Sequence, residues 1–145
     1  MVLVGARPRE AAFTPDGERA YVTSEIAGEV ALLDLDRGEI ANKVKLEGTD
    51  AKPKGVVLLP ERGELFVTTG RGNSIEVLDA ETLAHRASIP VGRRVWGLAA
   101  SPDGALLFSA DGLDDAVSVV DVETRERLTQ IPVGERPWGL AVLER

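Results

Sequence analysis

Cationic and aromatic side chains recur at one point of a repeated segment, and their types suit the binding of an anion. Each of three arginines stands two residues after a glycine. For two of these arginines, a tryptophan stands two residues further along the chain. A guanidinium group binds carboxylate or phosphate through paired hydrogen bonds, and an indole ring stacks on a planar ligand. With one lysine from a more divergent copy, the candidate ligand-binding set is Arg7, Lys54, Arg94, Trp96, Arg136 and Trp138.

The segment that carries these residues identifies the chain as a repeat array. Residues 89–99 read IPVGRRVWGLA and return at 131–141 as IPVGERPWGLA. Equivalent glycines stand at positions 5, 48, 92 and 134, with spacings of 43, 44 and 42 residues. This period is typical of a four-stranded propeller blade.

Turn residues divide each repeat into short strands rich in β-branched and apolar residues. Pro15-Asp16-Gly17 and Pro102-Asp103-Gly104 are typical of tight hairpin turns, because proline fixes φ and glycine accepts a positive φ. We therefore predict an all-β fold in one domain over residues 1–145. Its four-stranded antiparallel blades are expected at about 6–47, 49–91 and 93–133, with one extra strand at 137–143.

Several motifs resemble a known repeat family. The segment Tyr21-Val22-Thr23-Ser24, the Pro-Asp-Gly turns and the residues from Val77 to Thr82 are similar to the YVTN family of β-propellers. The Arg-Pro-Trp-Gly and Arg-Val-Trp-Gly copies, together with residues 70–74, resemble propellers that accompany pyrroloquinoline-quinone-dependent (PQQ-dependent) alcohol oxidation. The resemblance implies a periplasmic location and places this chain at the C-terminal end of such a propeller.

The number of repeats falls short of the closed rings of about seven blades that the resemblance implies. Three blades cannot close a ring, and an open arc exposes apolar blade faces that are seldom left uncovered on soluble monomers. We therefore expect self-association, most simply a homodimer of two arcs that together approximate a six-bladed ring.

Composition narrows the function classes. The net charge of -7 argues against nucleic acid as a partner, and no apolar stretch is long enough to span a membrane. The N-terminus shows no signal peptide, so the chain is expected to be cytosolic, mature or cut down. With no cysteine and one histidine, His85, neither a thiolate metal site nor a Ser-His-Asp triad is expected.

The cations nevertheless gather at one place in this acidic chain. Seven of the 17 lysines and arginines lie in the connections that lead into the first strand of each repeat. In a propeller these connections surround one mouth of the central channel, where they would create a positive field. Two interpretations stay open. The residues form an anion site at the mouth, or the arginines donate hydrogen bonds to carbonyls of the neighbouring blade and the tryptophans pack between blades.

Acidic residues offer weaker candidates. The loop from Asp111 to Asp115 holds three carboxylates but lacks the spacing of a calcium loop. Asp34, Asp79 and Asp121 recur at the end of the third strand of every repeat, which indicates a turn-capping role.

The first hypothesis is therefore a noncatalytic scaffold that binds a protein partner or a small anionic ligand at the channel mouth, linked to periplasmic quinoprotein oxidation. It requires no cofactor and no metal. One alternative is a lactonase-like propeller hydrolase, which would need a metal held by channel carboxylates and asparagines. Another is an assembly fragment without activity of its own.

Overall fold

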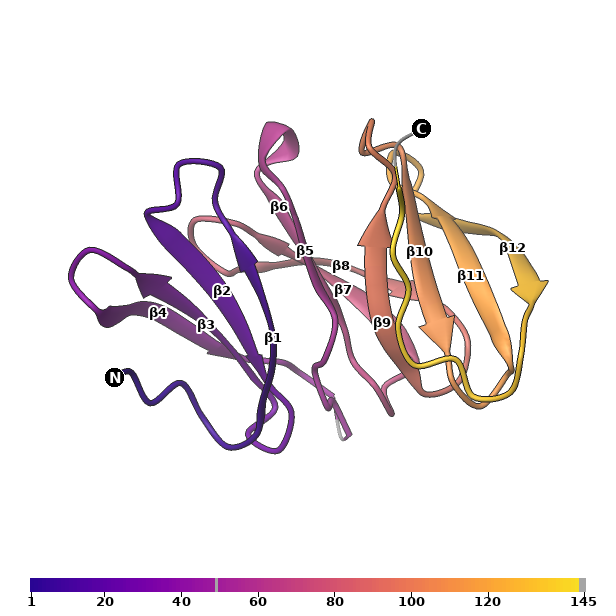
Figure 1. Cartoon of the computed structure of the whole chain (residues 1–145), viewed down its shortest axis with the longest axis horizontal. Helices are drawn as coiled ribbons and strands as arrows, with labels where there is room; N and C mark the ends of the chain where they lie inside the picture. Colours follow the sequence, from indigo (N-terminus) through magenta and orange to yellow (C-terminus); the bar gives the residue numbers. More distant parts are fainter. Residues whose placement is uncertain (49, 144–145) are drawn as a thin grey trace.

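The computed structural model describes residues 1–48 and 50–143 and contains three antiparallel sheets of four strands each. Figure 1 shows the sheets side by side as an arc, from the indigo first blade to the orange third. The all-β fold and the four-stranded blades are thus confirmed. The predicted first residue of the second blade, residue 49, lies outside the described residues, as do 144–145 at the predicted end of the domain.

The strands follow one another in space in the order in which they occur in the chain. The first blade contains β1 (Pro8–Phe13), β2 (Arg19–Ser24), β3 (Glu29–Asp34) and β4 (Glu39–Lys45). The second contains β5 (Val56–Leu59), β6 (Glu64–Thr68), β7 (Ser74–Asp79) and β8 (His85–Pro90), with a 3-10 turn at Pro60–Arg62. The third contains β9 (Val95–Ala100), β10 (Leu106–Asp111), β11 (Ala116–Asp121) and β12 (Glu126–Pro132).

The recurrent aspartates cap turns, as the sequence predicts. Asp34 accepts a hydrogen bond from the backbone N–H of Arg37 at 2.8 Å, and Asp121 accepts one from that of Thr124 at 2.7 Å. Asp79 accepts hydrogen bonds from the backbone N–H of Thr82 at 2.7 Å and of Glu81 at 2.9 Å. Hydrogen bonds of this kind lower the pKa of the Asp79 carboxyl to about 2. The aspartates therefore fix the hairpins between the third and fourth strands.

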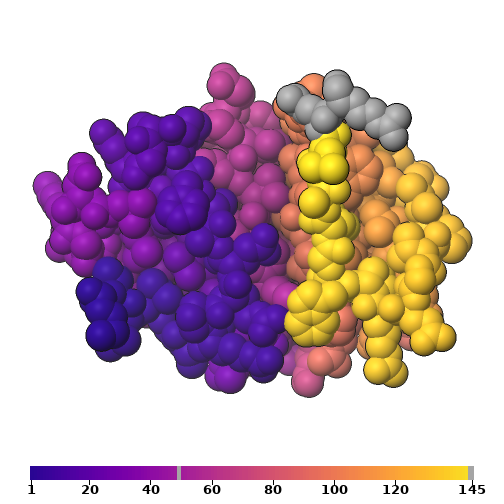
Figure 2. All heavy atoms as spheres, viewed as in Figure 1, coloured from indigo at the N-terminus to yellow at the C-terminus, as the bar shows by residue number. Residues whose placement is uncertain are grey.

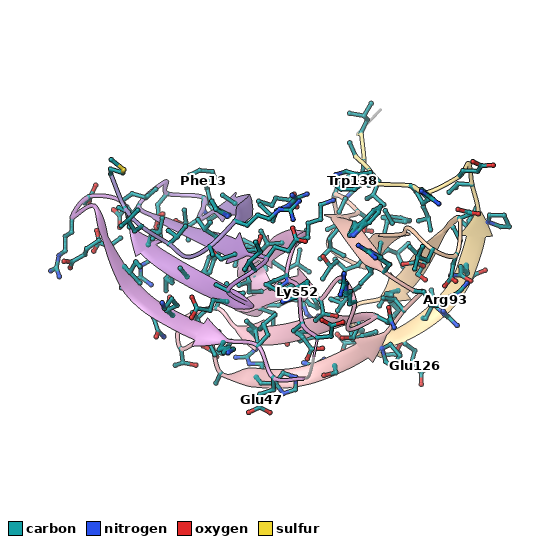
Figure 3. The ribbon with its side chains drawn as sticks, turned by 90° about the horizontal axis from the view of Figure 1, so that it is seen from below. Phe13, Glu47, Lys52, Arg93, Glu126 and Trp138 are labelled. Carbon is teal, nitrogen blue, oxygen red and sulfur yellow. The ribbon has the colours of Figure 1, made fainter. Side chains whose placement is uncertain are left out.

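Two apolar cores lie between the blades. One joins the first and second blades around Tyr21, Leu32 and Leu65, and the other joins the second and third around Phe66 and Leu107. The Tyr21 hydroxyl donates a hydrogen bond of 2.9 Å to the carbonyl of Ala80 in the next blade. The side view in Figure 3 places Glu47 and Glu126 on the convex side of the arc.

The C-terminal segment differs from the expectation of an extra strand at 137–143. Up to residue 143 it forms no ladder with a strand, although it runs close to β9. A side chain on Gly97 would meet the Cα of Gly139 at 2.8 Å, so only glycine permits this approach. Figure 2 shows the segment, in yellow, as a ridge between the first and third blades. In the described part of the chain no helix is long and apolar enough to cross a membrane.

Candidate functional site: a buried lysine at the propeller axis

The three repeated arginines share a backbone conformation, as their equal offsets suggest. Arg7, Arg94 and Arg136 have positive φ angles of 61°, 55° and 48°. The backbone N–H of Arg94 donates to Asn73 Oδ1, and that of Arg136 donates to Asp115 Oδ1, each at 2.8 Å. A loop of the preceding sheet thus holds each of these two turns in place.

The side chains of these arginines separate into different surroundings. Arg7 Nε lies 3.3 Å from Glu25 Oε2, whereas Arg94 Cζ lies 5.6 Å from the centre of the Trp96 ring. Arg7 and Arg94 line one cavity of about 230 Å³ beside the connections that lead into β1, β5 and β9, which we call the mouth cavity, and Arg136 does not line it. The structure therefore brings together two of the three predicted arginines.

A second set of equivalent positions converges more closely. A second shared position holds Arg9, Lys54, Trp96 and Trp138, each of which stands two residues after Arg7 or its counterpart in the repeat. Lys54 Nζ lies 3.3 Å from the Trp138 ring centre and 4.9 Å from that of Trp96. The two ring centres are 4.2 Å apart, and Arg9 Cζ lies 5.5 Å from that of Trp138. Two cations and two indoles thus meet at the axis of the arc.

Hydroxyl groups of the preceding blade hold two of these axial residues in place. Thr23 Oγ1 donates to the Lys54 carbonyl, and Thr68 Oγ1 donates to the Trp96 carbonyl, each at 2.7 Å. The corresponding residue of the third blade is Ala110, which has no hydroxyl to offer the next copy. The segment around Trp138 therefore lacks the hydroxyl contact that holds Lys54 and Trp96.

Lys54 is the most unusual residue of the site. Only 8% of its surface is exposed, and among the described residues its Nζ has no hydrogen-bond partner. Burial, together with the nearby Arg9 cation, lowers the pKa of the Lys54 amine to about 8, although Glu25 and Glu10 oppose the change. A buried ammonium of this kind is costly and is found chiefly where it serves a function.

Lys54 also lines two cavities. It lines the mouth cavity with Arg7, Arg94 and Trp96. It also lines an axial cavity of about 320 Å³ together with Arg9, Glu10 and Trp138. Partial desolvation raises the pKa of the Glu10 carboxyl, while the Lys54 charge opposes that rise. An ammonium group, a carboxyl group and guanidinium groups are thus available around one point.

The importance of Arg9 and Glu25 was not evident from the sequence. Arg9 was one of the clustered cations, but only an alignment of the four copies reveals that it shares the axial position of Lys54, Trp96 and Trp138. Glu25 lies between β2 and β3 and binds the side chains of both Arg7 and Arg9, at 3.3 and 3.4 Å. No repeat pattern in the sequence marks it.

The carboxylates of the loop after β10 have separate partners. Asp111 is fully buried and accepts hydrogen bonds from Ser109 at 2.9 Å and Ser118 at 2.5 Å, whereas Asp114 Oδ1 lies 2.6 Å from Arg93 Nε. Within residues 1–48 and 50–143 no group of three histidine, cysteine or acidic side chains is placed to hold a metal ion. These carboxylates therefore hold the third blade, its entry turn and, through Asp115, the turn that follows the blade.

His85 lies in β8 and contacts both a serine and a glutamate. Its Nε2 is 2.7 Å from Glu76 Oε2 and 3.1 Å from Ser88 Oγ. A catalytic triad uses one ring nitrogen for the serine and the other for the carboxylate. Because both contacts here fall on the same nitrogen, this cluster does not have the geometry of a triad.

Comparison with solved structures supports the fold. Kuenenia stuttgartiensis hydrazine synthase matches with a TM-score of 0.82 and 21% identity, over 91% of this chain and 38% of that chain. A candidate 6-phosphogluconolactonase from Bacteroides fragilis matches with a TM-score of 0.84 and 19% identity, over 94% and 42%. The chain thus spans about two fifths of the length of these proteins. No curated protein matches the sequence.

A family model corrects the functional expectation. The model described as "Lactonase, 7-bladed beta-propeller" matches residues 2–132. The expectation of a protein that is not an enzyme is therefore wrong, because this match points to a hydrolase-like family. The motifs interpreted as a YVTN signature are propeller motifs, and the propeller itself is confirmed. The chain belongs to the Lactonase family of seven-bladed β-propellers.

Proposed function

We propose that this chain belongs to a hydrolase that opens a lactone carrying an anionic group, and that Lys54 lies at the reacting centre. The observation that carries the proposal is the buried Lys54 ammonium, which has no hydrogen-bond acceptor among the described residues and lines both cavities. The family match supports a lactone as the substrate. The name of the Bacteroides fragilis protein, a 6-phosphogluconolactonase, supports a phosphorylated one.

The mouth cavity suits the anionic part of such a substrate. Arg7 and Arg94 line it, together with Arg71 and the half-buried Trp96. No carboxylate of the described residues lies within salt-bridge distance of Arg94, so its guanidinium is available to a phosphate or carboxylate. Paired hydrogen bonds from arginine orient such a group as well as bind it.

The axial cavity suits the hydrolytic step. In lactone hydrolysis a water oxygen bonds to the carbonyl carbon, and the negative charge that develops on the carbonyl oxygen needs a donor. The Lys54 ammonium supplies that donor from a site of low solvent exposure. Glu10, in the axial cavity with Lys54, takes the proton of the water. When the ring C–O bond breaks, this proton passes to the leaving oxygen and yields a hydroxy acid.

A lactone hydrolysis assay tests this function. We expect 6-phosphoglucono-δ-lactone to be opened at least about 10-fold faster than uncharged glucono-δ-lactone, after subtraction of spontaneous hydrolysis. Lys54→Met should lower kcat by about 100-fold, the cost of losing one oxyanion donor. Arg94→Gln should instead raise KM.

Arg37→Gln is the matched control. Arg37 lies in the turn between β3 and β4, and its side chain is 74% exposed. The loss of this guanidinium group should leave both kcat and KM unchanged. Hydrolysis no faster than the spontaneous rate for both lactones, or full activity of a folded Lys54→Met variant, would contradict the proposed function.

A periplasmic location and an association with PQQ-dependent alcohol oxidation remain proposals that rest on the Arg-Pro-Trp-Gly resemblance alone. Fractionation of the natural host with an antibody to this chain tests the location. Recovery in the cytosolic fraction would contradict both proposals.

A further inference from the structure

We propose that the Lys54 amine is a covalent carbonyl-binding site, which forms a reversible imine with an aldehyde or ketone that carries a phosphate or carboxylate group. This goes beyond lactone hydrolysis, because it requires the neutral amine as a nucleophile and no attack by water. Four features of the site support it: the position of the amine, its protonation, the nearby guanidinium groups and the indole rings.

The position of the amine favours reaction with a small molecule. Lys54 is buried, with 8% of its surface exposed, yet it forms part of the wall of two cavities. Its Nζ makes no hydrogen bond to the described residues. The nitrogen lone pair of the neutral amine is therefore not engaged by a protein donor.

The surroundings increase the neutral fraction of the amine relative to an ordinary lysine. The charged groups around Lys54 are Arg7 ahead of β1, Arg9 and Glu10 on β1, Glu25 after β2, and Arg94 ahead of β9. Burial is the largest influence and lowers the pKa to about 8 from the ordinary 10.5. At pH 7 about a tenth of such an amine is neutral, against roughly three in ten thousand for an ordinary lysine. A desolvated lysine beside other cations is an activated nucleophile.

The cations and the indoles define the ligand class. Arg7, Arg71 and Arg94 line the mouth cavity, and Glu25, which pairs with Arg7, also lines it. The cations outnumber this one carboxylate and attract a phosphate or carboxylate. Trp96 lines the same cavity and offers a face to a planar ligand, and its ring centre lies 4.9 Å from the amine. An anionic aldehyde whose carbonyl reaches Lys54 thus satisfies both ends of the site.

The reaction balances without an oxidant or a reductant. The neutral amine adds to the carbonyl carbon, and a proton moves from nitrogen to the former carbonyl oxygen to give a carbinolamine. Loss of the hydroxyl with the second nitrogen proton releases one water and leaves a carbon–nitrogen double bond. Addition of water reverses the sequence and restores both the amine and the aldehyde.

Reductive trapping with pyridoxal 5′-phosphate tests the inference. The protein is incubated with the aldehyde at pH 7, reduced with sodium borohydride, digested and quantified lysine by lysine by mass spectrometry. We expect Lys54 to carry at least about 10 times the label of Lys52, which lies two residues away in the same connection. Pyridoxal, which lacks the phosphate, should label Lys54 at least about 10-fold less.

Two variants and a pH series complete the design. Lys54→Arg should abolish the dominant label, whereas Lys43→Arg, on the outer strand β4, should leave it unchanged. The labelling rate at Lys54 should level off above pH 8, while that at Lys52 should keep rising. Equal labelling of Lys52 and Lys54 in the unaltered protein would overturn the inference, even if Lys54→Arg failed to fold.

The result is separable from the proposed function. Selective labelling with no lactone hydrolysis would retain the carbonyl site and reject the hydrolase. Lactone hydrolysis without selective labelling would retain the hydrolase and reject the carbonyl site.

Discussion

Replacing Lys54 by methionine should change the pH dependence of stability in a defined direction. The folded state lowers the pKa of the amine from 10.5 to about 8, so between these values the unfolded chain binds more protons than the folded one. The stability of the unaltered protein therefore rises with pH over this window. Methionine keeps the length of the side chain and removes the titration, so Lys54→Met lacks this contribution.

The size of the effect follows from the two pKa values. Burying the ammonium costs about 3 kcal/mol at pH 7 and about 2 kcal/mol at pH 9, where more of the folded protein has lost the proton. The free energy of unfolding of Lys54→Met should exceed that of the unaltered protein by less at pH 9 than at pH 7, by up to about 1 kcal/mol. Attraction of the ammonium to the Trp96 and Trp138 rings offsets part of the cost.

Urea unfolding followed by far-ultraviolet circular dichroism measures this difference at a fixed protein concentration. Groups that titrate equally in both proteins cancel when one free energy of unfolding is subtracted from the other. A difference that stays constant from pH 7 to 9, or that grows with pH, would refute the description of Lys54 as a buried cation.

Three further predictions concern the blade contacts and the assembly. Gly55→Ala places a Cβ 2.7 Å from the Trp96 carbonyl oxygen, so it should lower the free energy of unfolding by about 1–3 kcal/mol. Gly139→Ala has open space around the new Cβ and should change that free energy little. Equal stability of the two variants in urea unfolding would contradict this prediction. Tyr21→Phe removes the hydrogen bond to the Ala80 carbonyl and should cost about 1–2 kcal/mol, and an unchanged unfolding midpoint would count against that contact. We also propose that two arcs associate, because large apolar side chains lie exposed toward both ends of the chain. Size-exclusion chromatography with light scattering should give the mass of a dimer. A stable monomer would reject ring closure by a second copy.

The blade pattern could be predicted because it depends on local chemistry. The spacing of the glycines, the Pro-Asp-Gly turns and the capping aspartates each constrain only a few neighbouring residues, and together they repeat with the period of one blade. The equal offsets of Arg7, Arg94 and Arg136 are local in the same way, and in the structure these residues share a positive φ. The extra strand at 137–143 could not, because strand formation requires a neighbouring strand to receive its hydrogen bonds.

The functional interpretation depended on more than the repeats. The sequence pattern favoured a scaffold because no acid or base recurs in every copy, whereas a catalytic group need occur in only one. Lys54 and Glu10 are both single exceptions to the repeat, and only the fold shows that they line the same cavity.

By itself, then, the sequence determined the three blades, their turns and the concentration of positive charge at one mouth. Only the tertiary structure decided that Lys54, Arg9 and two tryptophans from different repeats meet at the axis. The physical reason is that turns and strands depend on neighbours in the chain, while the burial of a charge depends on how the blades pack. That packing brings Lys54 against Trp138, 84 residues further along the chain, and lowers the pKa of its amine to about 8.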